Sequence, residues 1–317
     1  MAGTTPAMTL FRARMPSKSN LGVYALLVLM PLFFVSNLVI GRAAIAHVEP
    51  WTLAFLRWGM ASAVLLPFAW SGIAAAAEQA RAAWREILAL GFLGMILCGG
   101  LVYVGLKSTT ATHGALIYAS SSIMIVLLEA AVYRQRLSAR TLAGALIGFA
   151  GVAVIVLEGN PQRLRELELG GDDLLIAFSA ASWAVYSVLL KRDRVARLAS
   201  LPLFALVAAA GSALLAPFML YEVVALGAFP TDMRAWAEIV AIVIFPSLLA
   251  FWLYQYGVKR VGPSVTGVYL YLLPVYGPAL AWLTLGEQIH PYHAVGMVLV
   301  LLGVVLATAK FQRTQTA

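Results

Sequence analysis

The sequence predicts an all-α integral membrane protein with ten transmembrane helices, arranged as two inverted repeats of five helices each. Three observations lead to this prediction: the composition, ten apolar segments of membrane-spanning length, and a match between the two halves of the chain. Of the 317 residues, 62% are hydrophobic and only 11% are charged. A soluble domain is typically about 45–50% apolar and about 25% charged, so the excess apolar surface requires lipid rather than water.

Each of the ten apolar segments is about as long as one membrane crossing, roughly 20 residues. The first segment is too long for the apolar core of a signal peptide, and Arg42 separates it from a cleavage-like site, so we interpret it as a membrane helix. The ten segments are residues 21–41, 51–70, 86–106, 112–133, 141–157, 173–190, 200–221, 237–257, 264–285 and 293–309.

The two halves of the chain match each other at an offset of 152 residues, with no gap between residues 105 and 152. Because five is an odd number of helices, the second half enters the membrane inverted relative to the first. Inverted repeats are typical of secondary transporters, which use two similar bundles for alternating access. The matching glycine pairs are Gly105 and Gly257, Gly144 and Gly296, and Gly151 and Gly303.

Positive charges predict the orientation. Sixteen of the 22 Lys and Arg residues fall on the side that carries both chain ends, five fall on the other side, and Arg57 lies within the second predicted helix. Cytoplasmic loops carry the excess of Lys and Arg, so both termini are expected in the cytoplasm of a multi-pass bacterial inner-membrane protein.

The polar, acidic connection at residues 158–172 is the longest in the chain and falls at its midpoint. It divides the protein into two five-helix units, and the charge pattern places it on the extracytoplasmic side. The expected parts are a cytoplasmic tail (1–20), a first five-helix repeat (21–157), the linker (158–172), a second repeat (173–309) and a second cytoplasmic tail (310–317).

Polar and aromatic side chains within the predicted helices indicate a central cavity. Lipid offers no hydrogen-bond partners, so polar groups in mid-membrane face the protein interior or a water-filled cavity. The same residue types also serve helix packing and the interfacial aromatic belt, so packing stays open as an alternative for each. The expected cavity residues are Phe33, Asn37, Tyr118, Ser122, Ser179, Trp183, Tyr186, Trp252, Tyr254, Tyr271 and Pro274.

Two charged residues within the spans are candidates for coupling or gating. Glu129 is the only carboxylate well inside a predicted span. It either pairs with Arg134 or Arg136, or senses cations or protons at the cytoplasmic mouth of the cavity. Arg57 either extends to the membrane interface or attracts an anionic group.

The fifth and tenth segments are rich in glycine and small aliphatic residues, so we expect them to be packing helices outside the transport core.

Other features exclude several functions. The single cysteine, Cys98, excludes an intrachain disulfide and a cysteine-based zinc cluster. No catalytic or nucleotide-binding motif is present in the sequence, so we expect no enzyme activity, no metal, no cofactor and no nucleic-acid partner.

Three segments carry a resemblance to a known family. Residues 50–57 (PWTLAFLR) resemble the start of the second helix in the EamA type of the drug/metabolite transporter superfamily. Residues 271–276 (YLLPVY), followed by 285–287 (LGE), resemble its ninth helix and its signature. The glycine pattern of the fifth and tenth helices also matches. In one departure, residues 133–136 (YRQR) lack the acid that the family has at the end of the fourth helix.

The resemblance covers both halves and implies an EamA-type ten-helix exporter. Within the superfamily, the chain is most similar to bacterial exporters of aromatic and other neutral amino acids. We therefore expect a secondary transporter that exports amino acids or related small metabolites by alternating access, without ATP. A multidrug, cation or nucleotide-sugar carrier of the same fold is the first alternative, and a membrane receptor or enzyme is the second. The substrate is a small molecule, and the oligomeric state stays open, with a monomer compatible.

The charge asymmetry generates a prediction about topology. In a Cys98-free variant, a cysteine introduced at residue 313 should react with a thiol reagent only from the cytoplasmic side, and one at residue 165 only from outside. Labelling of residue 313 from outside, or of residue 165 from inside, would reverse the orientation.

Overall fold

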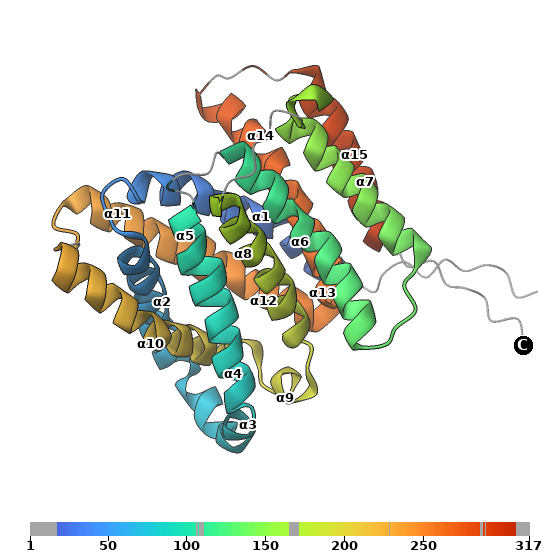
Figure 1. The fold of residues 1–317 in the computed structure, drawn as a ribbon. Helices are drawn as coiled ribbons and strands as arrows, with labels where there is room; N and C mark the ends of the chain where they lie inside the picture. The colour runs from blue at the N-terminus through green and yellow to red at the C-terminus, as the bar shows by residue number, and fades with distance from the viewer. Residues whose placement is uncertain are drawn as a thin grey trace, which may run out of the picture.

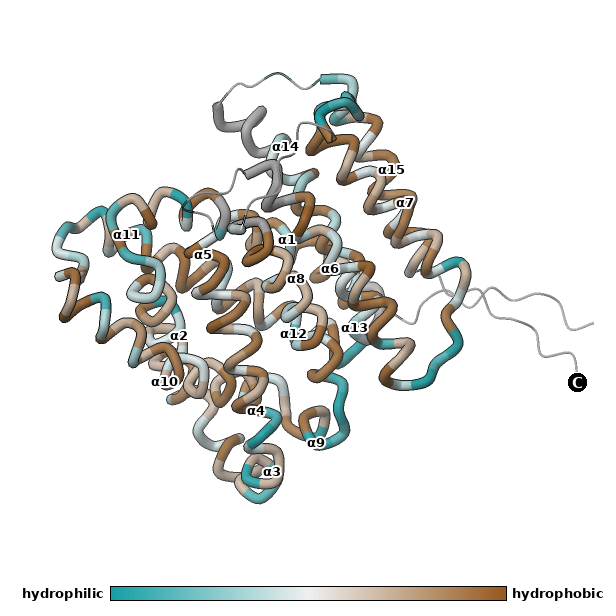
Figure 2. The backbone as a smooth tube through the Cα atoms, viewed as in Figure 1, coloured by the Kyte–Doolittle hydropathy of each residue, from teal (hydrophilic) through white to brown (hydrophobic). Residues whose placement is uncertain are grey.

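The computed structural model describes residues 18–105, 107, 111–164, 171–227, 229–285, 288 and 290–308. Over these residues the chain is helical and contains no β-strand (Figure 1). The helices are coloured as apolar along most of their length, with hydrophilic residues at connections such as those around α9 (Figure 2). The all-α membrane class is therefore confirmed. The expected tails, apart from residues 18–20, and residues 165–170 of the expected linker lie outside the described residues.

The described part of the first half forms five helical segments, of which four are long and apolar enough to cross a membrane and one, Leu116–Val132, is shorter. Its third segment is continuous but contains a π-helical stretch, η1. The elements are α1 (Lys18–Ala44), α2 (Pro50–Ala75), α3 (Ala77–Ala82), α4 (Trp84–Gly91), η1 (Phe92–Gly100), α5 (Leu101–Gly105), α6 (Ala111–Val132) and α7 (Ala139–Val156).

The second half repeats this order. Its third segment again contains a π-helical stretch, η3, and its fourth contains a 3₁₀ turn, η4. The elements are η2 (Pro161–Leu164), α8 (Gly171–Leu189), α9 (Asp193–Ala196), α10 (Ser200–Leu226), α11 (Met233–Ile242), η3 (Val243–Ala250), α12 (Phe251–Val261), α13 (Pro263–Val268), η4 (Tyr269–Leu272), α14 (Leu273–Leu285) and α15 (Pro291–Thr308).

The helical segments follow the predicted spans to within a few residues. Seven helices of the described part are long and apolar enough to cross a membrane, and shorter apolar helices lie at Leu116–Val132 and Leu174–Leu189. The remaining predicted span, 264–285, is divided by η4 just before Pro274, which has no N–H to continue the helical hydrogen bonds. The predicted end of the seventh span at residue 221 is too early, because α10 continues to Leu226.

The π-helical stretches occupy matching places in the two halves. Widening a helical turn requires a local cause. In η3, Pro246 removes one backbone donor, and the hydroxyl of Ser247 donates to the carbonyl of Ile242 at 2.8 Å. In η1, Gly94 and Gly99 let Tyr186 and Trp58 approach the backbone closely. The repeat therefore includes a conformational feature that the sequence comparison did not reveal.

The first helix of each half packs against helices of the other half. Helix α1 packs against α11, η3 and α12, and also against η4 and α14, all of the second half. Helix α8 packs in the corresponding way against η1, α5 and α6 of the first half. The two halves are therefore interlocked, and the centre of the protein is built from both.

The fifth and tenth segments, α7 and α15, lie side by side at one edge of the molecule (Figure 1). Their backbones touch through glycines: a Cβ atom on Gly151 would lie 2.7 Å from the carbonyl oxygen of Gly296, and one on Gly303 would lie 2.5 Å from the amide nitrogen of Gly148. Close backbone approach through small residues is how helices associate strongly in lipid. These two segments are therefore packing helices, as predicted.

The glycine contacts generate a prediction about stability. Gly151→Ala places a methyl group 2.7 Å from the Gly296 carbonyl and from the amide nitrogen of Val300, and should cost about 1–3 kcal/mol through overpacking. The measurement is the thermal unfolding midpoint of the purified protein in detergent, which should fall by several degrees. Gly22→Ala is the matched control, because a Cβ atom there meets nothing within 4 Å. Equal midpoints for the two variants would contradict the packing argument.

Candidate functional site

Six aromatic rings from both halves meet at the centre of the protein, and we call them the aromatic cluster. Trp183 lies in its middle, with its ring centroid 4.6 Å from that of Tyr254 and 5.1 Å from that of Tyr186. Phe251 lies 5.2 Å from Trp183 and 4.7 Å from Trp58. Such spacings are typical of favourable aromatic pairs. The members are Phe34 of α1, Trp58 of α2, Trp183 and Tyr186 of α8, and Phe251 and Tyr254 of α12.

The polar ends of the aromatic cluster are only partly satisfied. The hydroxyl of Tyr254 lies 2.6 Å from that of Ser187, and the Gln255 amide donates to the Tyr186 hydroxyl at 2.8 Å. The buried indole N–H of Trp58 and the Oε1 atom of Gln255 have no hydrogen-bond partner among the described residues. Because an unsatisfied buried polar group costs about 1–3 kcal/mol, these atoms indicate a place where a ligand or water would be stabilised.

Arg57 lies beside the aromatic cluster and is buried, with 2% of its surface exposed. Its Nε donates to Ser247 Oγ at 2.6 Å, and its Nη1 donates to Asn37 Oδ1 at 3.0 Å and to the Tyr103 hydroxyl at 2.9 Å. The guanidinium carbon lies 4.7 Å from the ring centre of Trp58. An extension of Arg57 to the membrane interface is therefore wrong, because polar oxygens of α1, α5 and η3 hold it inside.

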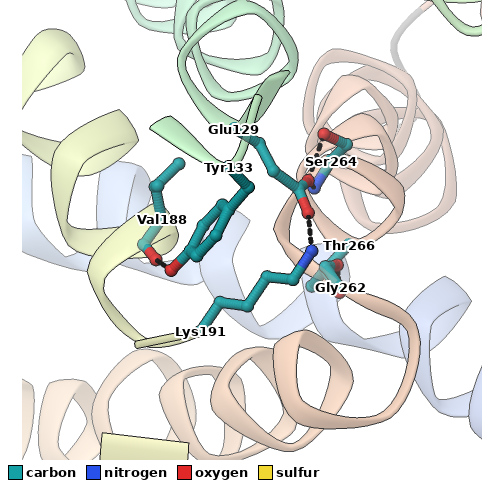
Figure 3. A network of polar contacts seen from close by, with 7 residues as sticks. All are labelled: Glu129, Tyr133, Val188, Lys191, Gly262, Ser264 and Thr266. Atoms are coloured by element: carbon teal, nitrogen blue, oxygen red, sulfur yellow. Dashed lines mark hydrogen bonds and ion pairs between the residues drawn. The ribbon is translucent and has the colours of Figure 1, made fainter. Parts of the chain in front are cut away.

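Glu129 forms a second polar network near the end of α6 (Figure 3). Its carboxylate accepts a hydrogen bond from Lys191 Nζ at 2.7 Å, and both the backbone N–H, at 2.8 Å, and the hydroxyl of Ser264 donate to it. The contact with Ser264 N caps the first turn of α13, where a negative charge is favourable. We call Glu129, Lys191 and Ser264 the Glu129 network. The predicted pairing of Glu129 with Arg134 or Arg136 is wrong: its partners come from the second half.

Tyr133 reinforces the Glu129 network. Its hydroxyl donates to the carbonyl of Val188 at 3.1 Å, and Lys191 Nζ lies 4.8 Å from the centre of its ring (Figure 3). The hydroxyl of Tyr133 therefore anchors the end of α6 to the backbone of α8. Helices α6, α8 and α13 are thereby tied together at one end of the molecule.

Two further carboxylates, outside the interiors of the predicted spans, are also buried. Glu222 is 4% exposed and accepts hydrogen bonds from Trp51 N at 3.2 Å and from Thr52 N at 2.7 Å. It therefore caps the first turn of α2 from α10. Glu222 was not among the predicted site residues, because the predicted span ends at residue 221 whereas α10 continues to Leu226. Glu86 is also buried, with Arg194 Nη1 3.6 Å from its carboxylate.

Four of the predicted cavity residues come together at the centre. Trp183, Tyr186 and Tyr254 belong to the aromatic cluster, and Asn37 contacts Arg57 beside it. Phe33 lies elsewhere, with its ring stacked on Phe245 at 6.4 Å. Phe34, the next residue, contacts Trp183 instead, at 5.9 Å. The residue of α1 that faces Trp183 is therefore Phe34, one position after the Phe33 that the sequence predicted.

The remaining predicted cavity residues make contacts between helices outside the aromatic cluster. Ser122 donates to the carbonyl of Gly267 at 2.9 Å, and Ser179 donates to that of Leu97 at 2.8 Å. These two bonds join the halves: α6 to α13, and α8 to η1.

The other four predicted residues are not members of the aromatic cluster. Tyr118 lies beside Cys98. Trp252 stacks on Tyr256 at 5.6 Å. Tyr271 packs against Gly148 of α7, and Pro274 follows η4. Whether these residues contact the substrate stays a prediction.

Helical halves that interlock across a buried polar centre are an architecture of secondary membrane transporters. The comparison with known proteins agrees. The chain belongs to the EamA-like transporter family, whose profile matches residues 21–157 and 172–309, so the organisation in two repeats is confirmed.

Several proteins named as transporters are similar to this chain over most of their length. The chain is 26% identical to the uncharacterized transporter YyaM of Bacillus subtilis over 91% of this chain and 94% of that protein. It is 28% identical to the aromatic amino acid exporter YddG of Ancylobacter novellus over 77% and 83% of the two chains. A protein crystal structure matches the fold with a TM-score of 0.70 at 25% identity, covering 89% of this chain and 95% of the other.

The Glu129 network generates a prediction about accessibility. A hydrogen bond to a charged group contributes about 1.5–3 kcal/mol, so Lys191→Met should open this end of the protein more often. In a Cys98→Ser background, a cysteine replacing the buried Thr266 reports this opening, because Thr266 follows Ser264 in α13. Its rate of reaction with a thiol reagent should rise about tenfold, since each 1.4 kcal/mol is a factor of ten.

Lys107→Met is the control for this experiment. Lys107 forms an exposed ion pair with Glu49, at 2.5 Å, near the opposite end of the helices. Its loss should leave the reaction of the cysteine at position 266 unchanged. Equal rates in the Lys191→Met variant and in the unmodified background would mean that the Glu129 network does not hold this end closed.

Proposed function

We propose that this transporter exports amino acids, aromatic and other neutral ones, or related small amphiphilic metabolites across the bacterial inner membrane. The aromatic cluster is the observation that carries the proposal. A substrate that enters between the halves would meet a large apolar area of rings that are buried in this structure. A ring face also attracts an ammonium group by about 0.5–2 kcal/mol. An amino acid with an apolar side chain combines the two groups that such a site favours.

The interlocked halves support alternating access as the mechanism. Helices α1 and α8 each pack against the opposite half, so a relative movement of the halves changes the contacts around the aromatic cluster. The Glu129 network joins α6 of the first half to α8 and α13 of the second. In the proposed orientation this network is the cytoplasmic gate: its closure seals the inner side, and its rupture admits substrate from the cytoplasm.

The energy source in this proposal is the substrate gradient, or exchange of one substrate for another, rather than ATP. Glu129 is the proposed coupling or gating acid, because it is 7% exposed and its carboxylate holds three helices together. Breaking its contacts with Lys191 and Ser264 would release the cytoplasmic side. The similarity to an exporter of aromatic amino acids supports the substrate class.

The aromatic cluster generates a prediction about selectivity. Trp183→Ala removes the central ring, so transport of aromatic amino acids should fall more than transport of small ones. The loss should be about 1.5–3 kcal/mol, the apolar contribution of one large side chain, or roughly 10–100-fold in rate at limiting substrate. The measurement is uptake of labelled phenylalanine and alanine into proteoliposomes containing equal amounts of folded protein.

Two further variants separate substrate binding from folding. Trp183→Phe keeps an aromatic surface and should retain most of the preference for phenylalanine. Trp70→Ala removes a tryptophan that is 68% exposed on α2 and should change neither rate. An unchanged ratio of phenylalanine to alanine uptake in Trp183→Ala would place the substrate away from the aromatic cluster.

A further inference from the structure

We propose that Arg57 is the carboxylate-binding group of this transporter, so that its substrates must carry a carboxylate. The inference rests on the proposed function and adds the chemical group by which the substrate is recognised. It also excludes amines and other cations without an acid group as good substrates.

The first argument is the charge balance around Arg57. An arginine within the membrane is costly unless its charge is compensated. Within the described part of the chain, Arg57 has no carboxylate partner: its three hydrogen bonds go to the neutral side chains of Ser247, Asn37 and Tyr103. The buried site therefore carries one uncompensated positive charge.

The buried acids of the described residues do not supply the missing charge, because each of them has partners of its own. Glu129 binds Lys191 and Ser264, Glu222 binds the start of α2, and Glu86 faces Arg194. An anionic group that enters from outside the chain would complete the charge balance at Arg57.

The second argument is geometric. Nε and Nη1 of Arg57 donate to protein oxygens, whereas no hydrogen bond from Nη2 is formed within the described residues. The occupied donors fix the plane of the guanidinium, and Nη2 is left to bind an oxygen anion. Tyr103 strengthens this arrangement by donating to Asn37 Oδ1 at 2.7 Å, which positions the same oxygen that Arg57 uses. A guanidinium held in one orientation is well suited to carboxylate recognition.

The third argument is the surroundings of the guanidinium. Its carbon lies 4.7 Å from the ring centre of Trp58 and 5.7 Å from that of Phe251, two members of the aromatic cluster. Trp58 also has a buried indole N–H that has no acceptor within the described residues. A carboxylate bound by Arg57 would lie beside these two rings, so the apolar side chain attached to it would contact the aromatic cluster. The guanidinium and the adjacent rings together favour a ligand that has both a carboxylate and an apolar side chain.

The test is an analogue series on the unmodified protein in proteoliposomes. Labelled phenylalanine is the tracer, and the competitors are unlabelled phenylalanine, phenylalaninamide and phenethylamine. These competitors share the aromatic ring and the amino group, and they differ in the carboxylate. The two analogues without a carboxylate should compete at least tenfold more weakly than phenylalanine. Equal competition by all three would overturn the role of Arg57 and leave the proposed function standing.

Variants then assign the discrimination to Arg57. Arg57→Gln should reduce phenylalanine uptake at least tenfold and remove the difference among the competitors, whereas Arg57→Lys should keep part of it. Lys107→Gln removes an exposed cation near the end of the helices and should leave the competitor ranking unchanged. A full preference for the carboxylate in Arg57→Gln would overturn the inference. If Arg57→Gln does not fold, the analogue series and Arg57→Lys still decide.

The same experiment separates the two proposals. If the unmodified protein takes up none of the twenty amino acids, the assignment of amino acids as substrates fails and the inference fails with it. If it takes up phenylalanine but does not distinguish the acid from its amide, only the inference fails.

Discussion

The packing of each half's first helix against the opposite half is the constraint on which the rest of the structure depends. Because α1 lies against η3 and α14, and α8 lies against η1 and α6, neither half encloses a core of its own. In lipid, every polar group must find its partner within the protein. Arg57 of the first half therefore reaches Ser247 of the second, and Glu129 reaches Lys191 and Ser264. The polar contacts that stabilise the fold are thus also the contacts between the halves.

The internal symmetry explains why certain residues recur. Gly144 contacts Gly303, and Gly151 contacts Gly296, and an offset of 152 residues converts one contact into the other. The contact between α7 and α15 therefore contains the same pair of glycines twice, once from each half, and both helices need small residues at the same spacing. The π-helical stretches η1 and η3 follow the same symmetry, although their causes differ: glycines beside large rings in one, and Pro246 with Ser247 in the other.

The candidate site was predictable in its composition but not in its contacts. Trp183, Tyr186 and Tyr254 were expected in the centre and lie in the aromatic cluster. The sequence pointed to Phe33 rather than Phe34, since neighbouring residues of a helix point about 100° apart and only the packing of α1 shows which one faces inward. The partners of Arg57 and Glu129 were missed because they lie up to 190 residues away in the chain.

The sequence by itself determined the membrane class, the ten apolar segments, the repeat and the packing role of the fifth and tenth helices. These follow from properties that are local along the chain: the length of an apolar run relative to the bilayer, the spacing of glycines and the order of similar segments. Only the tertiary structure decided which half each first helix packs against, that Arg57 is buried with no carboxylate partner among the described residues, and that Glu129 joins three helices. These depend on the rotation and mutual position of helices that are distant in sequence, and a linear pattern does not encode that geometry directly.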